Sequence, residues 1–394
     1  MSRWQVHRRI EGSDGGRLTP RALTAPPARR SRAVTWLGTL TLALLLAAGC
    51  AGCGASSVEQ PTSSVASLPT VRGGTVAQTP WSVLTSTGQT HYPVTIHDCH
   101  GATTYTKPPG RIISLDDSAT DTLVALGLAD KVVGVTKFEL PSQEWPQDAA
   151  VVDRLHTLTI AQDYPSLESI VALRPDFVIS AFPSAFTQGI GPATPARWKS
   201  FGVSSYETVA DCGQYSSTPL SNFNLMYTDM HNLGVIFNRQ AAASREIKHL
   251  QEQVDAAQAR AKAAGLGNYL VGQANGMTQS PGTMGVTTNN AIISLAGSTY
   301  AFVKQDTNPN LSVSWEQVVK DNPQVFWLIT QQGTSVAQME HVLESNPQLA
   351  TITAIKHHAY VPISYFDAAG SPRAVQGVQD LVAGLIALKH AGKL

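Results

Sequence analysis

Charged, amide and aromatic side chains follow several short apolar runs of the chain, at points where strands would end. Asp117 comes just after the run that ends at Leu115, and Lys137 and Phe138 come just after Val135. In open α/β sheets ligands bind beyond the carboxyl ends of the strands, so these positions are candidates for contact with a solute. Aromatic and amide groups suit a bulky, partly polar solute, and a guanidinium suits an anionic one. The candidate ligand-binding residues are Asp117, Lys137, Phe138, Phe182, Phe186, Asn275, Trp315, Tyr365 and Arg373.

Motifs typical of catalysis are missing from the sequence. A secreted hydrolase would carry its nucleophile in a G-x-S-x-G turn, and no such motif occurs. Neither of the glycine-rich phosphate-binding patterns, G-x-G-x-x-G after a strand or G-x-x-x-x-G-K, occurs either. We therefore expect no enzymatic activity and no resident cofactor.

The histidines do not form a metal-binding pattern. A zinc site in an α/β protein would need several histidines at converging strand ends. His357 and His358 instead precede an apolar run. We expect no metal site, and capture of a metal ion remains a lesser alternative. The other histidines considered as ligands are His97, His100 and His156.

The charges are balanced, with 28 basic and 28 acidic residues in 394. A surface that follows nucleic-acid phosphates needs a basic excess, so we expect no nucleic-acid partner.

The first residues have the organisation of an export signal. Arg29, Arg30 and Arg32 precede an apolar run over residues 34–48 that ends in small residues. This run of about fifteen residues is shorter than the roughly 20 residues of a permanent membrane span. We interpret residues 1–49 as a signal peptide.

The end of the signal peptide resembles a bacterial lipobox. In the stretch over residues 46–50, small residues precede Cys50, which we expect to be lipidated and to become the mature N-terminus. Lipidation at Cys53, or cleavage without lipid, are the alternatives. Residues 50–90 are rich in Ser, Thr, Gly and Pro and predict a flexible tether. The protein is thus expected on the extracytoplasmic face of the cell membrane, held there by its lipid anchor.

Short apolar runs alternate with helical patterns through the folded part of the chain. Residues 111–115 and 131–135 predict strands, and residues 118–128 between them predict a helix that starts at Ser118. Apolar strands that alternate with helices indicate a parallel sheet covered on both faces.

A long helix divides this alternation. Over residues 239–265, apolar residues recur three and four positions apart, from Ile247 to Ala261. The fold class predicted is α/β, with two Rossmann-like lobes of mainly parallel sheets over residues 91–238 and 266–394, joined by this helix. About 300 folded residues also favour two domains over one.

Several segments, taken in order, resemble the iron-siderophore and cobalamin solute-binding proteins of ABC importers. In that family, a single rigid helix bridges two lobes. The resemblance implies a monomer that holds a small molecule between its lobes and delivers it to an ABC permease dimer. The matching segments are residues 92–96, 107–115, 119–127, 164–178, 314–325 and 370–373.

The resemblance also implies roles for particular residues. Glu168 and Glu316 occupy the positions at which such proteins present one acidic side chain per lobe to arginines of the permease. The arginine of the Ser-Pro-Arg segment, Arg373, often faces the cleft in this family.

Relatives in this family bind ferric siderophores, corrinoids, haem or a deazaflavin (F420) precursor. We expect a ferric siderophore, with the other three as alternatives. Asp116 and Asp117 depart from the neutral residues usual at their positions, which argues against an anionic ferric complex.

Two cysteines lie in the folded part of the chain. An oxidising exterior favours a disulfide between Cys99 and Cys212, and two separate buried thiols are the alternative.

Overall fold

The computed structural model describes residues 88–138, 149–160, 163–210, 221–275, 288–302, 313–330 and 334–394. The predicted signal peptide, the lipidation at Cys50, the alternative Cys53 and the disulfide partner Cys212 lie outside these ranges. Within them, no helix combines the length and the apolar character that crossing a bilayer requires.

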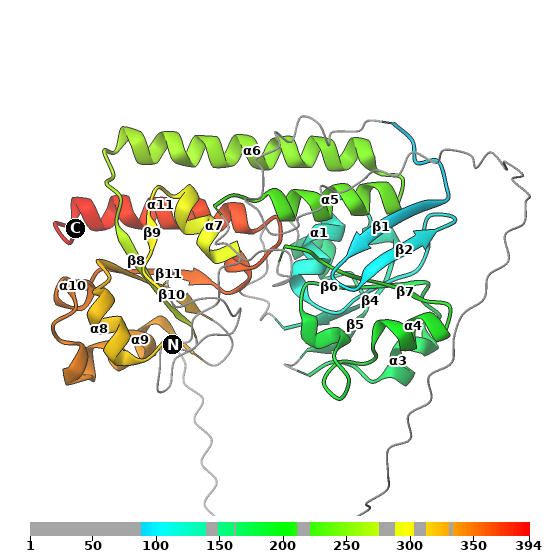
Figure 1. The fold of residues 1–394 in the computed structure, drawn as a ribbon, viewed down its shortest axis with the longest axis horizontal. Coiled ribbons are helices and arrows are strands. Elements are labelled where there is room, and N and C mark those ends of the chain that lie inside the picture. The colour runs from blue at the N-terminus through cyan, green and yellow to red at the C-terminus, as the bar shows by residue number, and fades with distance from the viewer. Residues whose placement is uncertain are drawn as a thin grey trace, which may run out of the picture. The chain divides into compact units, whose positions relative to one another are not determined.

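The first lobe is built on a five-stranded parallel sheet with strand order β5-β4-β3-β6-β7, preceded by an antiparallel hairpin. Its helices connect the strands and cover the sheet (Figure 1). The strands are β1 (Val94–Asp98), β2 (Gly101–Tyr105), β3 (Ile112–Ser114), β4 (Val132–Lys137), β5 (Thr157–Ile160), β6 (Phe177–Ser180) and β7 (Ser204–Glu207). The helices are α1 (Asp117–Ala125), α2 (Ala149–Val152), α3 (Leu167–Ala172), α4 (Pro195–Ser200) and α5 (Asn224–Ile236). Two short 3-10 turns are η2 (Ala129–Lys131) and η4 (Pro183–Phe186).

The second lobe carries a four-stranded parallel sheet with strand order β11-β10-β8-β9. Its strands are β8 (Leu270–Asn275), β9 (Thr299–Tyr300), β10 (Val325–Thr330) and β11 (Tyr360–Ser364), and its helices are α7 (Thr288–Leu295), α8 (Trp315–Asp321), α9 (Val336–Ser345), α10 (Thr353–Lys356) and α11 (Ala374–His390), with 3-10 turns η6 (Pro347–Leu349) and η7 (Phe366–Ala368).

Helix α6 (Gln240–Ala263) links the lobes and packs against α5 of the first lobe and α11 of the second (Figure 1). At 1.5 Å per residue it is roughly 36 Å long. The apolar face predicted from the sequence is the buried one, and includes Ile247, Leu250 and Val254. The predicted fold class, two α/β lobes with parallel sheets joined by one long helix, is confirmed.

The strands of the first sheet are covered on both faces. Ile112 belongs to the main core cluster, which also includes α5, α6 and the second lobe, whereas Ile113 belongs to a second cluster with Ile170 and Trp198. Successive residues of a strand point to opposite faces, which is why β3 contributes to both clusters. The strands of the first sheet are therefore packed between two apolar clusters.

The predicted start of the first helix was wrong by two residues. Asp116, not Ser118, is the N-cap of α1, because its carboxylate accepts a hydrogen bond from the backbone N–H of Ala119. Ser118 lies inside the first turn and is buried. Helix α5 and the β1–β2 hairpin were not predicted as such.

Candidate functional site

The carboxyl ends of β3, β4 and β6 meet at one edge of the first sheet. At this edge, Asp116 is hydrogen-bonded both to the start of α1 and to the end of β6. Its Oδ1 accepts a hydrogen bond from Ala119 N at 2.8 Å, and its Oδ2 accepts from Ser180 Oγ and Ala181 N, both at 2.7 Å. Burial raises the pKa of the Asp116 carboxyl, and these hydrogen bonds oppose that rise. Asp116 therefore fixes the turn before α1 to the end of β6.

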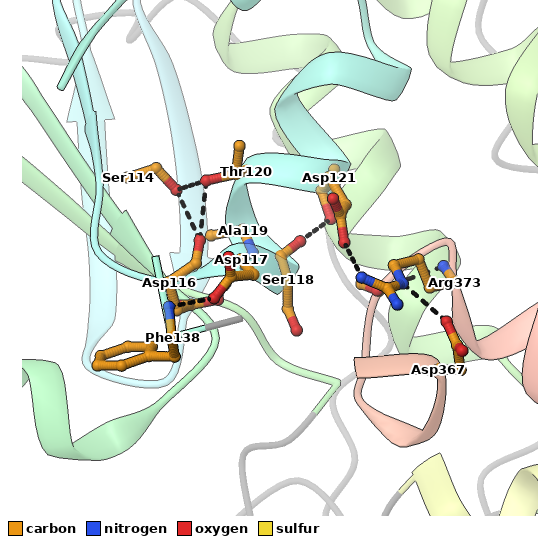
Figure 2. Close-up of polar contacts among 12 residues, drawn as sticks. Ser114, Asp116, Asp117, Ser118, Ala119, Thr120, Asp121, Phe138, Asp367 and Arg373 are labelled. Carbon is orange, nitrogen blue, oxygen red and sulfur yellow. Dashed lines mark hydrogen bonds and ion pairs between the residues drawn. The ribbon is translucent and has the colours of Figure 1, made fainter. Parts of the chain in front are cut away.

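The next residue, Asp117, positions the residue that follows β4. Its Oδ2 accepts a hydrogen bond from the backbone N–H of Phe138 at 2.7 Å (Figure 2). Phe138 is only partly buried. The carboxylate predicted to contact a ligand thus lies directly beside an aromatic side chain predicted to do the same.

Four partly exposed aromatic side chains form a continuous series, which we call the aromatic row: Tyr164, Phe138, Phe182 and Tyr365. The ring centroids lie 5.5 Å apart for Tyr164 and Phe138, 6.3 Å for Phe138 and Phe182, and 6.2 Å for Phe182 and Tyr365. Phe138 and Phe182 follow strands of the first lobe, and Tyr365 follows β11 of the second. The row therefore runs across the strand ends of both lobes.

One end of the aromatic row is held by a hydroxyl contact. The hydroxyls of Tyr164 and Ser184 lie 2.7 Å apart, and burial raises the pKa of Tyr164 to about 12. The phenol is neutral at physiological pH and offers both a flat face and a polar tip.

Arg373 is engaged by two carboxylates from different lobes. Its Nε donates to Asp367 Oδ1 at 2.7 Å, and its Nη1 lies 3.8 Å from Asp121 Oδ2 (Figure 2). Only 2% of Arg373 is exposed. We call Asp121, Arg373 and Asp367 the ion triad; it connects α1 of the first lobe to the segment before α11 of the second. The Arg373 guanidinium is therefore buried between two carboxylates of the protein.

Lys137 is also buried and paired. It is 9% exposed, and its Nζ lies 3.7 Å from Asp153 Oδ1, in the segment that follows α2. Its charge is directed toward that carboxylate.

The remaining predicted ligand-binding residues take different positions. Phe186 is 3% exposed and packs in the second core cluster, edge-to-face with His100, rather than in the aromatic row. Asn275 ends β8, and its buried Oδ1 has no hydrogen-bond partner among the described residues. Trp315 is the first residue of α8 and packs partly buried against the core of the second lobe.

Of the nine predicted positions, Phe138, Phe182 and Tyr365 lie together, with Asp117 beside them.

Sequence reasoning missed Tyr164, Asp121 and Asp367. Tyr164 follows no predicted strand, and Asp121 lies inside a helix, so neither fitted the strand-end rule. Asp367 is six residues before Arg373, in the same strand-end loop. A carboxylate so close to an arginine predicted to bind the ligand was the one available signal.

Glu168 and Glu316 occupy equivalent positions in the two lobes. Each is the second residue of a helix whose N-cap serine, Ser166 or Ser314, accepts a hydrogen bond from the backbone three residues on. Both glutamates are exposed. Since α3 leads into β6 and α8 into β10, each helix starts at the edge where its parallel strands end. Hydrogen bonds from its own backbone N–H and from Ser314 lower the pKa of Glu316.

The tip of the β1–β2 hairpin is tied to the end of β7. His100 Nε2 lies 2.7 Å from Glu207 Oε2, and Asp98 accepts hydrogen bonds from the backbone N–H groups of His100 and Glu207 at 2.9 and 3.1 Å. Cys99 is disulfide-bonded, and its Sγ lies 3.2 Å from the carbonyl oxygen of Thr208. The pairing with Cys212 stays a prediction, because residue 212 is not described.

The His100–Glu207 contact predicts that the hairpin stabilises the protein less as the pH rises. The hydrogen bond to Glu207, and the charges of Glu207 and Asp98, raise the pKa of His100 against the opposing effect of burial. The folded state thus binds the proton more tightly than the unfolded state, so the contribution is present below about pH 6.5 and is lost as the pH rises through the raised pKa.

Urea denaturation at about pH 6 and about pH 9 tests this expectation. The stability advantage of the wild type over His100→Gln should shrink from the lower to the higher pH. His97→Gln, an exposed position on the same hairpin, is the matched control for replacing a histidine there. A constant difference for His100→Gln would contradict the expectation.

No cluster of three or more His, Cys, Asp or Glu side chains suited to a metal ion occurs among the described residues.

The model of the periplasmic binding protein family matches residues 112–361. An uncharacterised ABC transporter substrate-binding lipoprotein of Bacillus subtilis, YvrC, is 24% identical over 299 residues, which cover 74% of this chain and 84% of the relative.

Solved structures share the fold. A structure described as an ABC-type Fe3+-hydroxamate transport system from Saccharomonospora viridis is 21% identical, with a TM-score of 0.64, and the match covers 75% of this chain and 99% of that one. The periplasmic heme-binding protein RhuT from a Roseiflexus species is 20% identical, with a TM-score of 0.54, and the match covers 70% of this chain and 98% of that one.

Proposed function

The chain belongs to the periplasmic binding protein family, and from this premise we propose that it captures a ferric siderophore between its two lobes and delivers it to an ABC permease dimer. The family consists of solute-binding transport proteins and is not a class of enzymes. The proposed protein works as a monomer, on the outer face of the cell membrane, held by the lipidated Cys50 through its tether.

The main support for this proposal is the aromatic row. Its rings are partly exposed, lie at the strand ends where α/β proteins bind ligands, and come from both lobes. A row of this kind offers a large apolar surface to a bulky ligand. The Saccharomonospora structure, named for Fe3+-hydroxamate transport, supports a siderophore, and the heme-binding Roseiflexus protein supports the haem alternative.

Delivery rests on the two exposed glutamates. Glu168 and Glu316 project from helix starts at the carboxyl edge of each sheet, the same edge as the aromatic row. A permease that contacted both lobes around the ligand would meet one carboxylate from each, and guanidinium groups bind such carboxylates in fixed geometry.

The tether increases the chance of that encounter. A chain anchored at Cys50 stays close to its permease, so docking becomes an event at high effective concentration. The Bacillus relative, named as a lipoprotein, supports this arrangement.

Removal of two rings from the aromatic row tests the proposal. Phe138→Ala with Phe182→Ala should weaken binding of ferrichrome, a ferric trihydroxamate, by at least about 100-fold, because each aromatic ring that the ligand buries contributes on the order of 1.5–3 kcal/mol. Quenching of intrinsic fluorescence by the ferric complex measures the affinity.

The matched control is Phe201→Ala. Phe201 is 42% exposed and lies at the end of α4, outside the aromatic row. It should leave affinity unchanged. Equal affinity of the wild type and the double variant would remove the aromatic row from the binding site, and tight binding of cobalamin without any binding of ferrichrome would favour the corrinoid alternative.

A further inference from the structure

Both cations among the predicted ligand-binding residues are engaged by carboxylates of the protein itself. Arg373 lies between Asp367 and Asp121, and Lys137 is directed toward Asp153. Both side chains are buried, at 2% and 9% exposure. A ligand anion that recruited Arg373 would compete with two buried carboxylates, which would lose their cation, and an anion that recruited Lys137 would compete with the exposed Asp153.

The turn at the start of α1 is likewise occupied by negative charge. A helix N-terminus attracts anions through its free N–H groups and its dipole. Here the Asp116 carboxylate already accepts from Ala119 N, and Asp117 is the first residue of the helix (Figure 2). This end of the helix therefore holds protein carboxylates where a ligand anion would otherwise bind.

The backbone of one residue of the aromatic row is hydrogen-bonded to one of these carboxylates. Asp117 Oδ2 is 2.7 Å from the backbone nitrogen of Phe138, whose ring is the second member of the row. Tyr365 lies two residues before Asp367 of the ion triad. A ligand stacked on the row would thus be close to acidic groups from both lobes.

From these contacts we infer that the cleft selects a ligand without net negative charge. It binds a neutral complex such as a ferric trihydroxamate in preference to an anionic ferric catecholate or to haem with its two propionates. Recognition comes from the aromatic faces, and the carboxylates disfavour anions. This inference rests on the proposed function, since it specifies the ligand of the same cleft.

A panel of three probes tests the inference on the wild-type protein. Ferrichrome is neutral, ferric enterobactin is a strongly anionic tris-catecholate, and haem carries two carboxylates. Ferrichrome should bind at least about ten-fold more tightly than either anionic probe, a difference of roughly 1.4 kcal/mol. Because salt screens repulsion between charges, a higher salt concentration should narrow the gap.

A charge variant tests whether the ion triad causes the preference for a neutral ligand. Asp367→Asn removes one of the two carboxylates that balance Arg373 and makes the region one unit more positive. The preference for ferrichrome over ferric enterobactin should then shrink several-fold. Asp321→Asn, at the far end of α8, makes the same change of net charge away from the ion triad and should leave the preference unchanged. Circular dichroism checks that each variant is folded, and Asp121→Asn replaces Asp367→Asn if that variant does not fold.

The outcomes separate the two proposals. Tighter or equal binding of ferric enterobactin or haem by the wild type would overturn the inference about charge while leaving solute capture intact. An unchanged preference in folded Asp367→Asn would remove the ion triad as its cause. If none of the three probes binds, the siderophore proposal fails, and the inference fails with it.

Discussion

Exchanging Glu168 and Glu316 together for arginine is expected to abolish import while leaving ligand affinity unchanged. Both side chains are exposed at helix starts on the carboxyl edges of the two sheets. If permease arginines bind them, the double variant places like charges opposite each other in both lobes, and such contacts cost several kcal/mol. Uptake of labelled ligand by cells with the cognate permease should fall by at least about 100-fold, which corresponds to roughly 2.7 kcal/mol.

The controls for this prediction are two glutamates on other helices. Glu252 lies on α6 and Glu340 on α9, and the pair Glu252→Arg with Glu340→Arg makes the same change of net charge. That variant should import the ligand normally. Uptake that survives in the Glu168 and Glu316 double variant would remove these residues from docking, and a loss of affinity there would place them in the ligand site.

Replacement of Asp116 by alanine is expected to have the largest effect on stability. Its carboxylate is fully buried and accepts hydrogen bonds from Ala119 N, Ser180 Oγ and Ala181 N. Alanine leaves two buried backbone donors without acceptors and removes the N-cap of α1. The lost cap, which is the hydrogen bond from Ala119 N, costs about 1 kcal/mol and the unsatisfied Ala181 N about 1–3 kcal/mol, so we expect a loss of about 3 kcal/mol.

Urea denaturation followed by circular dichroism measures this loss. Asp116→Asn should be intermediate, because its amide oxygen can still accept one of the hydrogen bonds. Asp130→Ala, in the short turn after α1, is a suitable control and should change stability by less than about 0.5 kcal/mol. A loss below about 1 kcal/mol for Asp116→Ala would mean that other groups satisfy these donors.

Local patterns predicted the framework of the fold well. The three- and four-residue spacing of Ile247, Leu250 and Val254 located α6 and its buried face. The alternation of apolar runs with a helical pattern over residues 111–135 located β3, α1 and β4. These features depend on neighbouring residues only, which a sequence displays directly.

Contacts between distant residues decided the rest. Arg373 was expected to face a ligand, but its position is determined by Asp121 in the other lobe and by Asp367. Phe182 and Phe186 are four residues apart, yet Phe182 precedes the 3-10 turn η4 and Phe186, its last residue, packs in the second core cluster. The composition and periodicity of the sequence do not show which distant residues contact each other.

The most direct test of the central claim is the pattern of hydrogen exchange when ferrichrome is added to the purified protein. Protection should concentrate at backbone amides beyond the ends of β4, β6 and β11, around Phe138, Phe182 and Tyr365, in both lobes at once. The opposite edge of the first sheet provides an internal comparison, because an open pocket lies there, lined by residues that include Val132, Val151, Arg154 and His156. Protection at that pocket, or at one lobe alone, would contradict capture of the ligand between the two lobes.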